Sequence, residues 1–118
     1  MPKRPILGLT EHIIIISPDG KEEKITARID TGATGSSMDI RLAADLRLSL
    51  MSKMKLVRSA SGIRRRPTIK AKIKLAGQII EEEFTIADRS HMTYPVLIGH
   101  NILKKGNFLI DPHKEAYS

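Results

Sequence analysis

The sequence predicts a mainly β fold in a single domain. Apolar and polar residues alternate along several segments with the two-residue period of half-buried strands. Gly-containing turns at residues 17–20 and 76–77 separate such segments, as is typical between antiparallel strands. The chain has 118 residues, of which 41% are hydrophobic, and this suits one modest core rather than two. We therefore expect residues 1–118 to form one lobe, with one or two short helices between the strands.

The N-terminal third is expected to consist of strands that lead to Asp30. Residues 5–17 hold apolar β-branched runs and end at Ser17-Pro18-Asp19-Gly20, which fits a type I turn. Alternating apolar residues over 25–29 then predict a half-buried strand immediately before Asp30. Asp39 is expected to cap a short helix over residues 40–48.

The rest of the chain contains the clearest hairpin. Within residues 68–87, Ile and Leu alternate with Lys on one strand and with Glu on the next, and Ala-Gly joins the two. Residues 53–59 predict a further strand, and residues 60–67, ASGIRRRP, an exposed loop. Residues 94–111 predict a short apolar strand, one helical turn and a closing strand.

Composition narrows the possible functions. The chain has no Cys, which excludes thiol nucleophiles, thiolate metal sites and disulfides. Thr10, Glu11 and His12 interrupt the first apolar runs and no small-residue cleavage pattern follows, which argues against a signal peptide. No stretch is long enough to span a bilayer. We therefore expect a cytoplasmic protein without a membrane partner.

The net charge of +7 and the pI of about 9.9 admit nucleic acid, an anionic surface or an acidic substrate as partner. Much of the Lys faces Glu on the neighbouring strand and forms a solvated face. The unopposed cations are Arg64 to Arg66 and the group Lys53, Lys55 and Arg58. Aromatic residues make up only 3% of the chain, so there is little surface for base stacking and nucleic acid is the least favoured partner.

Asp30-Thr31-Gly32 is the motif that carries the most chemistry. An Asp followed by a small residue and Gly after a strand is usually a turn. Here Gly32 and Ala33 leave the carboxylate open to a ligand, and the apolar-apolar-Gly run VLIG, residues 96–99, comes some way further along the chain. In this order of elements the sequence resembles the retropepsin-like aspartic proteases, which implies a closed β barrel with one lobe per chain.

Four segments resemble one family within that clan more closely. They are ILGLTEHI, ARIDTGATGSSM, IADRSHMTYPVLIGHNIL and GNFLID. The family is the RimB-like family, labelled as ATP-dependent zinc proteases and associated with RimK-type ATP-grasp ligases. Two positions depart from its pattern. His100 stands where an Arg usually follows the VLIG glycine, and Thr34 stands where a charged residue often follows the motif.

The resemblance implies an aspartic peptidase that acts as a symmetric homodimer. Two carboxylates that share one proton activate a water, and one chain of this length offers a single Asp-Thr-Gly. Asp30 would supply the carboxylate, Thr31 would bond across the two-fold axis, and the Gly32 N–H would bond the carboxylate. Asp39 and Asp111 compete as the second carboxylate, but Asp39 is expected to cap a helix and Asp111 to end a strand.

The resemblance also implies a flap that closes over bound peptide, and residues 60–67 occupy its place. The substrate-binding residues are then expected to be Ala33, Thr34, Arg64, Arg65 and Arg66. Three arginines suit carboxylates, which they bind by paired hydrogen bonds. Together with the associated ligases, which add glutamate to proteins, this indicates acidic or glutamate-rich tails as substrate.

No cofactor is expected. His12, His91, His100 and His113 are not spaced as zinc ligands, and GATGSS lacks the Gly-Lys-Ser/Thr ending of a phosphate loop. A binding or scaffold protein with this fold and no hydrolysis remains the alternative, because a fold does not determine a function.

Overall fold

The computed structural model describes residues 3–60 and 62–116, apart from the side chains of residues 52, 53 and 59. The expected Lys53 cation therefore lies outside the described side chains. The elements, in chain order, are β1 (Ile6–Leu7), β2 (Thr10–Ile16), β3 (Glu22–Ile29), β4 (Ser36–Asp39), α1 (Ile40–Asp45), β5 (Leu50–Ser59), β6 (Gly62–Leu75), β7 (Gln78–Ala87), β8 (Val96–Ile98), α2 (His100–Lys105) and β9 (Leu109–Ile110).

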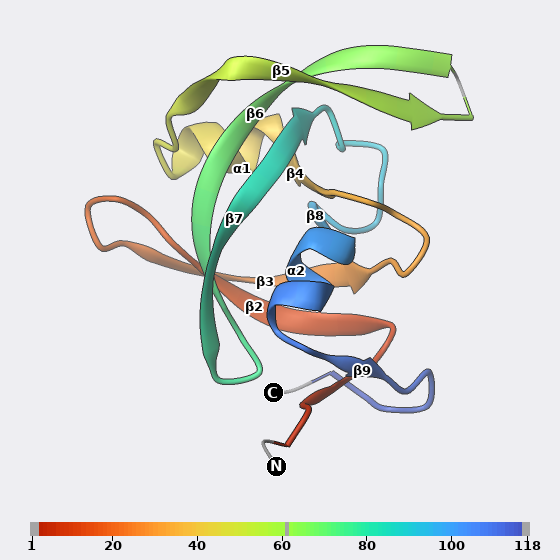
Figure 1. Ribbon diagram of the computed structural model, residues 1–118. Coiled ribbons are helices and arrows are strands. Elements are labelled where there is room, and N and C mark those ends of the chain that lie inside the picture. Colours follow the sequence, from red (N-terminus) through yellow and green to blue (C-terminus); the bar gives the residue numbers. More distant parts are fainter. Residues whose placement is uncertain (1–2, 61, 117–118) are drawn as a thin grey trace.

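Six strands close into a barrel. They are hydrogen-bonded in the order β2-β3-β8-β4-β7-β6, and β6 pairs with β2 to complete the circle (Figure 1). The interior is filled by aliphatic side chains and Phe84, most of them fully buried. Burial of a large apolar side chain stabilises a fold by about 1.5–3 kcal/mol. The predicted single β lobe with one or two short helices is thus confirmed, and the described chain has two helices, α1 and α2.

The hairpin of β6 and β7 forms where the sequence predicts it. The inward face of β6 buries Ile69, Ala71, Ile73 and Leu75, while the Lys residues between them are exposed. The connecting Ala-Gly pair has φ angles of 49° and 80°, which are those of the type I′ turn that suits the twist of two-residue hairpins.

The prediction of an exposed loop over residues 60–67 is wrong. Strand β5 continues to Ser59 and β6 begins at Gly62, so Arg64, Arg65 and Arg66 lie on a strand. They pair with Val57, Leu56 and Lys55 of β5, and this pairing satisfies the backbone groups that a loop would leave to water. The result is a long two-stranded ribbon that extends beyond the barrel (Figure 1).

Two shorter elements also differ from the expectation. The apolar run over 5–17 is split into β1 and β2. Between them Gly8 packs so closely against the Lys114 carbonyl that a Cβ would lie 2.3 Å from its oxygen. The helix after Asp39 ends at Asp45, since Leu46 is its C-cap and Arg47 has a φ of 54°. The Asp39 cap itself is present, with the side chain accepting from Arg41 N–H.

The two ends of the chain lie together, on the side of the barrel away from the ribbon (Figure 1). Strands β1 and β9 pair in parallel, and the Lys114 Nζ bonds the fully buried Glu11 carboxylate at 3.0 Å. Glu11 also accepts from the Gly8 N–H at 2.7 Å. Neither helix in the described part of the chain has the length and hydrophobicity that crossing a bilayer requires.

Candidate active site

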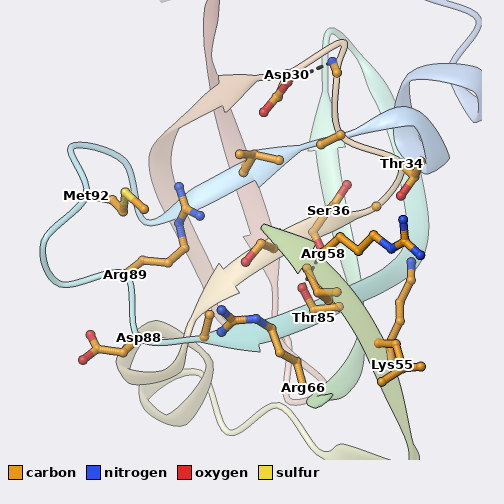
Figure 2. A pocket seen from close by; sticks show the side chains of 18 residues that line it. Asp30, Thr34, Ser36, Lys55, Arg58, Arg66, Thr85, Asp88, Arg89 and Met92 are labelled. Atoms are coloured by element: carbon orange, nitrogen blue, oxygen red, sulfur yellow. Dashed lines mark hydrogen bonds between the residues drawn. The ribbon is translucent and has the colours of Figure 1, made fainter. Parts of the chain in front are cut away.

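Asp30 leaves the end of β3 at the start of a short loop that connects to β4. Its backbone N–H donates to the Ile98 carbonyl at 2.9 Å, so the loop begins bound to the neighbouring strand β8. The Asp30 carboxylate accepts from the Gly32 N–H at 2.9 Å, as expected for this motif (Figure 2). Gly32 is exposed and Asp30 is half-buried, which leaves the carboxylate accessible.

Gly99 supports this loop from below. A Cβ at Gly99 would lie 2.0 Å from the Gly35 carbonyl oxygen and 2.7 Å from the Ala33 carbonyl oxygen, so no side chain fits there. The Gly99 N–H donates to the buried Ser36 Oγ at 2.9 Å, and this hydroxyl donates to Asn101 at 2.7 Å. The VLIG run therefore has to end in Gly, because the motif loop packs directly on that residue.

His100 makes two contacts with the same loop. Its backbone N–H donates to the Ala33 carbonyl at 2.8 Å. Its ring Nε2 contacts the Thr31 carbonyl oxygen, a geometry that requires a hydrogen on Nε2. The residue that departs from the family pattern thus binds the motif within one chain. Thr31 is exposed, and its bond across a two-fold axis stays a prediction.

A cleft of about 710 Å³ lies between this loop and the ribbon of β5 and β6. Asp30, Gly32, Ala33 and Thr34 form part of its lining, so four of the five predicted loop residues share this cleft. The remaining lining comes from the end of the motif loop, from β4, β7 and β8, from the ribbon, and from the segment after β7. Those residues are Gly35, Ser36, Ser37, Lys55, Leu56, Val57, Arg58, Arg66, Thr85, Ala87, Asp88, Arg89, Met92 and Leu97.

The ribbon brings cations to the cleft, although not the three that the sequence suggested together. Of the predicted triplet only Arg66 lines the cleft, whereas Arg64 and Arg65 are exposed elsewhere on β6. Lys55 and Arg58 of β5 line it as well (Figure 2). The sequence marked these two as unopposed charges but gave no sign that they line the same cleft as Asp30.

Arg89 is a cation of the cleft that the sequence did not single out. It is half-buried, and its Nε donates to the Tyr94 carbonyl at 3.1 Å, which fixes the direction of the guanidinium. Burial lowers the pKa of Arg89, Asp39 opposes this, and Arg28 and Arg66 lower it further. Guanidinium nevertheless remains protonated in proteins. Its position in the RimB-like segment DRSHMTYP was the available signal.

Asp39 and Asp111, the two competitors for the second catalytic carboxylate, and Asp88 of the cleft all accept hydrogen bonds within the chain. Asp39 accepts from the Arg89 N–H at 2.7 Å and from the Arg41 N–H at 3.2 Å. Asp111 accepts from the His113 N–H at 2.9 Å. Asp88 lines the cleft, but in Figure 2 it lies far from Asp30, and bonds from the Ser90 hydroxyl and N–H lower its pKa.

The donor groups do not fit a zinc site. Across residues 3–60 and 62–116, no three His, Asp or Glu side chains come together as metal ligands. Two of the histidines have other contacts, since His12 bonds the Thr26 hydroxyl at 3.0 Å and His100 contacts the loop.

Several solved structures share this fold. A Legionella pneumophila protein of unknown function has a TM-score of 0.70 at 19% identity, covering 97% of this chain and 98% of that chain. The EIAV protease, complexed with the inhibitor HBY-793, has a TM-score of 0.65 at 20% identity, with 92% of each chain covered. The simian foamy virus protease has a TM-score of 0.57 at 17% identity, covering 80% of this chain and 91% of that one. At these identities the likeness shows the fold alone.

A search of curated proteins found no match. A family profile, described as RimB-like, retropepsin-like aspartic endopeptidase RimB, matches residues 41–117, about two thirds of the chain. The matched segment begins after Asp30-Thr31-Gly32, so it includes the ribbon and the VLIG run but not the motif itself. The retropepsin-like barrel and this match agree, and the chain belongs to the RimB-like family of retropepsin-like aspartic endopeptidases.

Proposed function

We propose that the protein is an aspartic peptidase in which Asp30 is the catalytic carboxylate. One observation carries this proposal: the Asp30 carboxylate stands at the end of a half-buried strand, accepts from Gly32, and opens into the cleft beneath the ribbon. A turn aspartate would need neither the cleft nor the tightly packed support that Gly99 gives to the loop. Membership in an aspartic endopeptidase family supports the same chemistry.

The second carboxylate comes from a second copy of the chain. Among the described residues, two carboxylates line the cleft, those of Asp30 and Asp88. Asp30 is accessible in the motif loop, whereas Asp88 accepts from the Ser90 hydroxyl and lies far from Asp30 in Figure 2. Two Asp30 side chains related by a two-fold axis would share one proton, because like charges about 3 Å apart cannot both ionise. The ionised carboxylate then takes a proton from water while the protonated one donates to the peptide carbonyl.

The charges in the cleft favour an acidic peptide as substrate. Four cations line it, Lys55, Arg58, Arg66 and Arg89, against the carboxylates of Asp30 and Asp88. Arginines bind carboxylates by paired charge-assisted hydrogen bonds, and a cleft excludes part of the water that weakens such pairs. We infer that a glutamate-rich segment lies along this cleft with its carboxylates on the ribbon side.

Substitution of Asp30 by Asn tests the proposal. The amide is nearly isosteric, so the fold should be retained, but it cannot share or accept the catalytic proton. We expect cleavage of a glutamate-rich peptide library, followed by mass spectrometry, to disappear in Asp30→Asn and to persist in Asp45→Asn. Asp45 is an exposed residue at the end of α1 and serves as a matched control. Equal cleavage by Asp30→Asn and wild type would make Asp30 a turn residue.

A further inference from the structure

The peptide between Thr31 and Gly32 connects His100 to Asp30. The Thr31 carbonyl and the Gly32 N–H belong to the same planar unit and point in opposite directions. On one side His100 Nε2 contacts the carbonyl oxygen. On the other side the N–H donates to the Asp30 carboxylate at 2.9 Å. One rigid peptide therefore lies between an imidazole and the carboxylate.

We propose that His100 is a positioning residue that orients the Asp30 carboxylate through this peptide. The inference rests on the proposed catalytic role of Asp30. By holding the Thr31 carbonyl, the imidazole fixes the direction in which the Gly32 N–H points. The bond at the carbonyl also polarises the peptide, which strengthens the N–H as a donor to the carboxylate.

The main-chain bonds of the loop do not fix this peptide by themselves. Asp30 N–H bonds Ile98, Ala33 N–H bonds the Asp30 carbonyl at 3.3 Å, and the Ala33 carbonyl accepts from His100 N–H. These bonds hold both flanks of the loop. A peptide unit can rotate between fixed flanks through its two adjacent torsions, and Gly32 makes that rotation cheap because it lacks a Cβ.

The linkage requires one tautomer of His100. Neutral imidazole carries a hydrogen on either Nδ1 or Nε2, and only the Nε2–H form can donate to the Thr31 carbonyl. We therefore expect long-range proton-nitrogen NMR spectra to show His100 protonated at Nε2 when the ring is neutral. A His100 protonated at Nδ1 would overturn the proposal.

Two variants distinguish the effect of the imidazole hydrogen-bond donor from the effect of the size of the side chain. His100→Leu removes the donor, whereas His100→Gln places an amide N–H close to the position of Nε2. We expect the Gly32 amide proton resonance to move upfield in His100→Leu and to return toward the wild-type position in His100→Gln. His12→Leu is the control, since His12 is also hydrogen-bonded but contacts Thr26 on the barrel. An unchanged Gly32 resonance in His100→Leu, with the fold retained, would overturn the linkage.

Kinetics tests the catalytic consequence. In His100→Leu we expect kcat to fall about tenfold with KM changed less than about twofold, the loss expected for one misplaced hydrogen bond in the transition state. His100→Gln should recover most of that loss. A rise in KM alone would overturn the positioning role. Absence of turnover in the wild type would remove the proposed function and the catalytic role of His100 with it, whereas the NMR spectra would still decide the linkage.

Discussion

At the scale of single residues, the site depends on close packing beneath the motif loop. Gly99 lies against two carbonyl oxygens, those of Gly35 and Ala33, and the Ala33 carbonyl also accepts from the His100 N–H. Backbone in that position cannot give way as a flexible side chain could. The loop therefore has one position relative to β8, and Asp30 takes its place from that packing.

Gly99→Ala should therefore destabilise the protein although it adds only one methyl group. We expect the free energy of unfolding in urea to fall by roughly 1–3 kcal/mol, the usual cost of overpacking. Gly32→Ala is the control in the same loop, because a Cβ there would meet the Asp30 carboxylate at 3.4 Å, an ordinary contact. Equal stability of Gly99→Ala and wild type would show that the loop can move away from β8.

Glu82 contributes a pH-dependent part of the stability. Burial raises its pKa, but bonds from the Glu83 N–H, Lys105 and Asn101 outweigh this, so the pKa is lowered from its ordinary value of 4.5. A lowered pKa in the folded state stabilises the protein above the unfolded value. That contribution is lost as the pH falls through the folded-state pKa.

Glu82→Gln should consequently be less stable than wild type at neutral pH, and the difference should shrink as the pH falls below about 4.5. Urea unfolding at a series of pH values measures it. Glu81→Gln is the control, because Glu81 is exposed and its 3.9 Å pair with Lys70 is worth little. A difference between Glu82→Gln and wild type that persists unchanged into acid would contradict this account.

At the scale of elements, the ribbon of β5 and β6 divides its cations between two surroundings. Lys55 and Arg66 are paired across the two strands and line the cleft, with Lys55 Nζ next to Gly35. Arg64 and Arg65 belong to the same strand as Arg66 but are exposed. Arg64 and Arg65 can therefore serve as a control for the effect of the charges of Lys55 and Arg66 on binding of a peptide.

The paired variant Lys55→Gln/Arg66→Gln should weaken binding of a glutamate-rich peptide by about tenfold, or about 1.4 kcal/mol for two partly screened charges. The salt dependence of binding should become less steep as well. Arg64→Gln/Arg65→Gln removes the same net charge and should change the affinity much less. Fluorescence anisotropy at two salt concentrations measures both. Equal effects of the two paired variants would mean that only the net charge matters.

The sequence predicted the elements that form through contacts between residues close together in the chain. The β6 and β7 hairpin has strong alternation and a turn that needs only Ala76 and Gly77. Strand β4 was missed because it is short and polar, and it forms only between β7 and β8, which come much later in the chain. The arginine-rich part of β6 was predicted as a loop because its pairing with β5 leaves both faces largely exposed, without apolar alternation.

The residues of the site also divide into those that local sequence patterns predict and those that only contacts between distant segments place. The motif residues could be predicted because Asp-Thr-Gly and VLIG are local patterns, and the structure brings the two together through Gly99 and the Ile98 carbonyl. The segment DRSHMTYP marked Arg89 as part of a family pattern but not as a residue of the cleft, since its place depends on the Asp39 bond to its N–H and on the Tyr94 carbonyl. No pattern in the chain indicates where such a side chain points.

Considered as a whole, one lobe supplies only one of the two carboxylates that the proposed reaction needs. The barrel is closed, so the second carboxylate has to approach from outside along the exposed loop of Thr31 and Gly32. A two-fold dimer formed through this loop would place the same loop of both copies at the axis. The whole-molecule expectation is therefore that activity belongs to pairs of chains and depends on both Asp30 side chains.

Mixed dimers provide the test. Random exchange between equal amounts of wild type and Asp30→Asn leaves only about a quarter of the dimers with two Asp30 carboxylates. We expect the activity per wild-type chain to fall to about half its unmixed value, because a mixed dimer lacks the shared proton. Mixing with Asp45→Asn should not lower the activity per wild-type chain, since the Asp45→Asn chains keep Asp30. Sedimentation at tens of micromolar, roughly where weak dimers still form, monitors the association. A strict monomer at that concentration would contradict a catalytic site shared between two chains. Full activity per wild-type chain after confirmed exchange would show that a single Asp30 is sufficient.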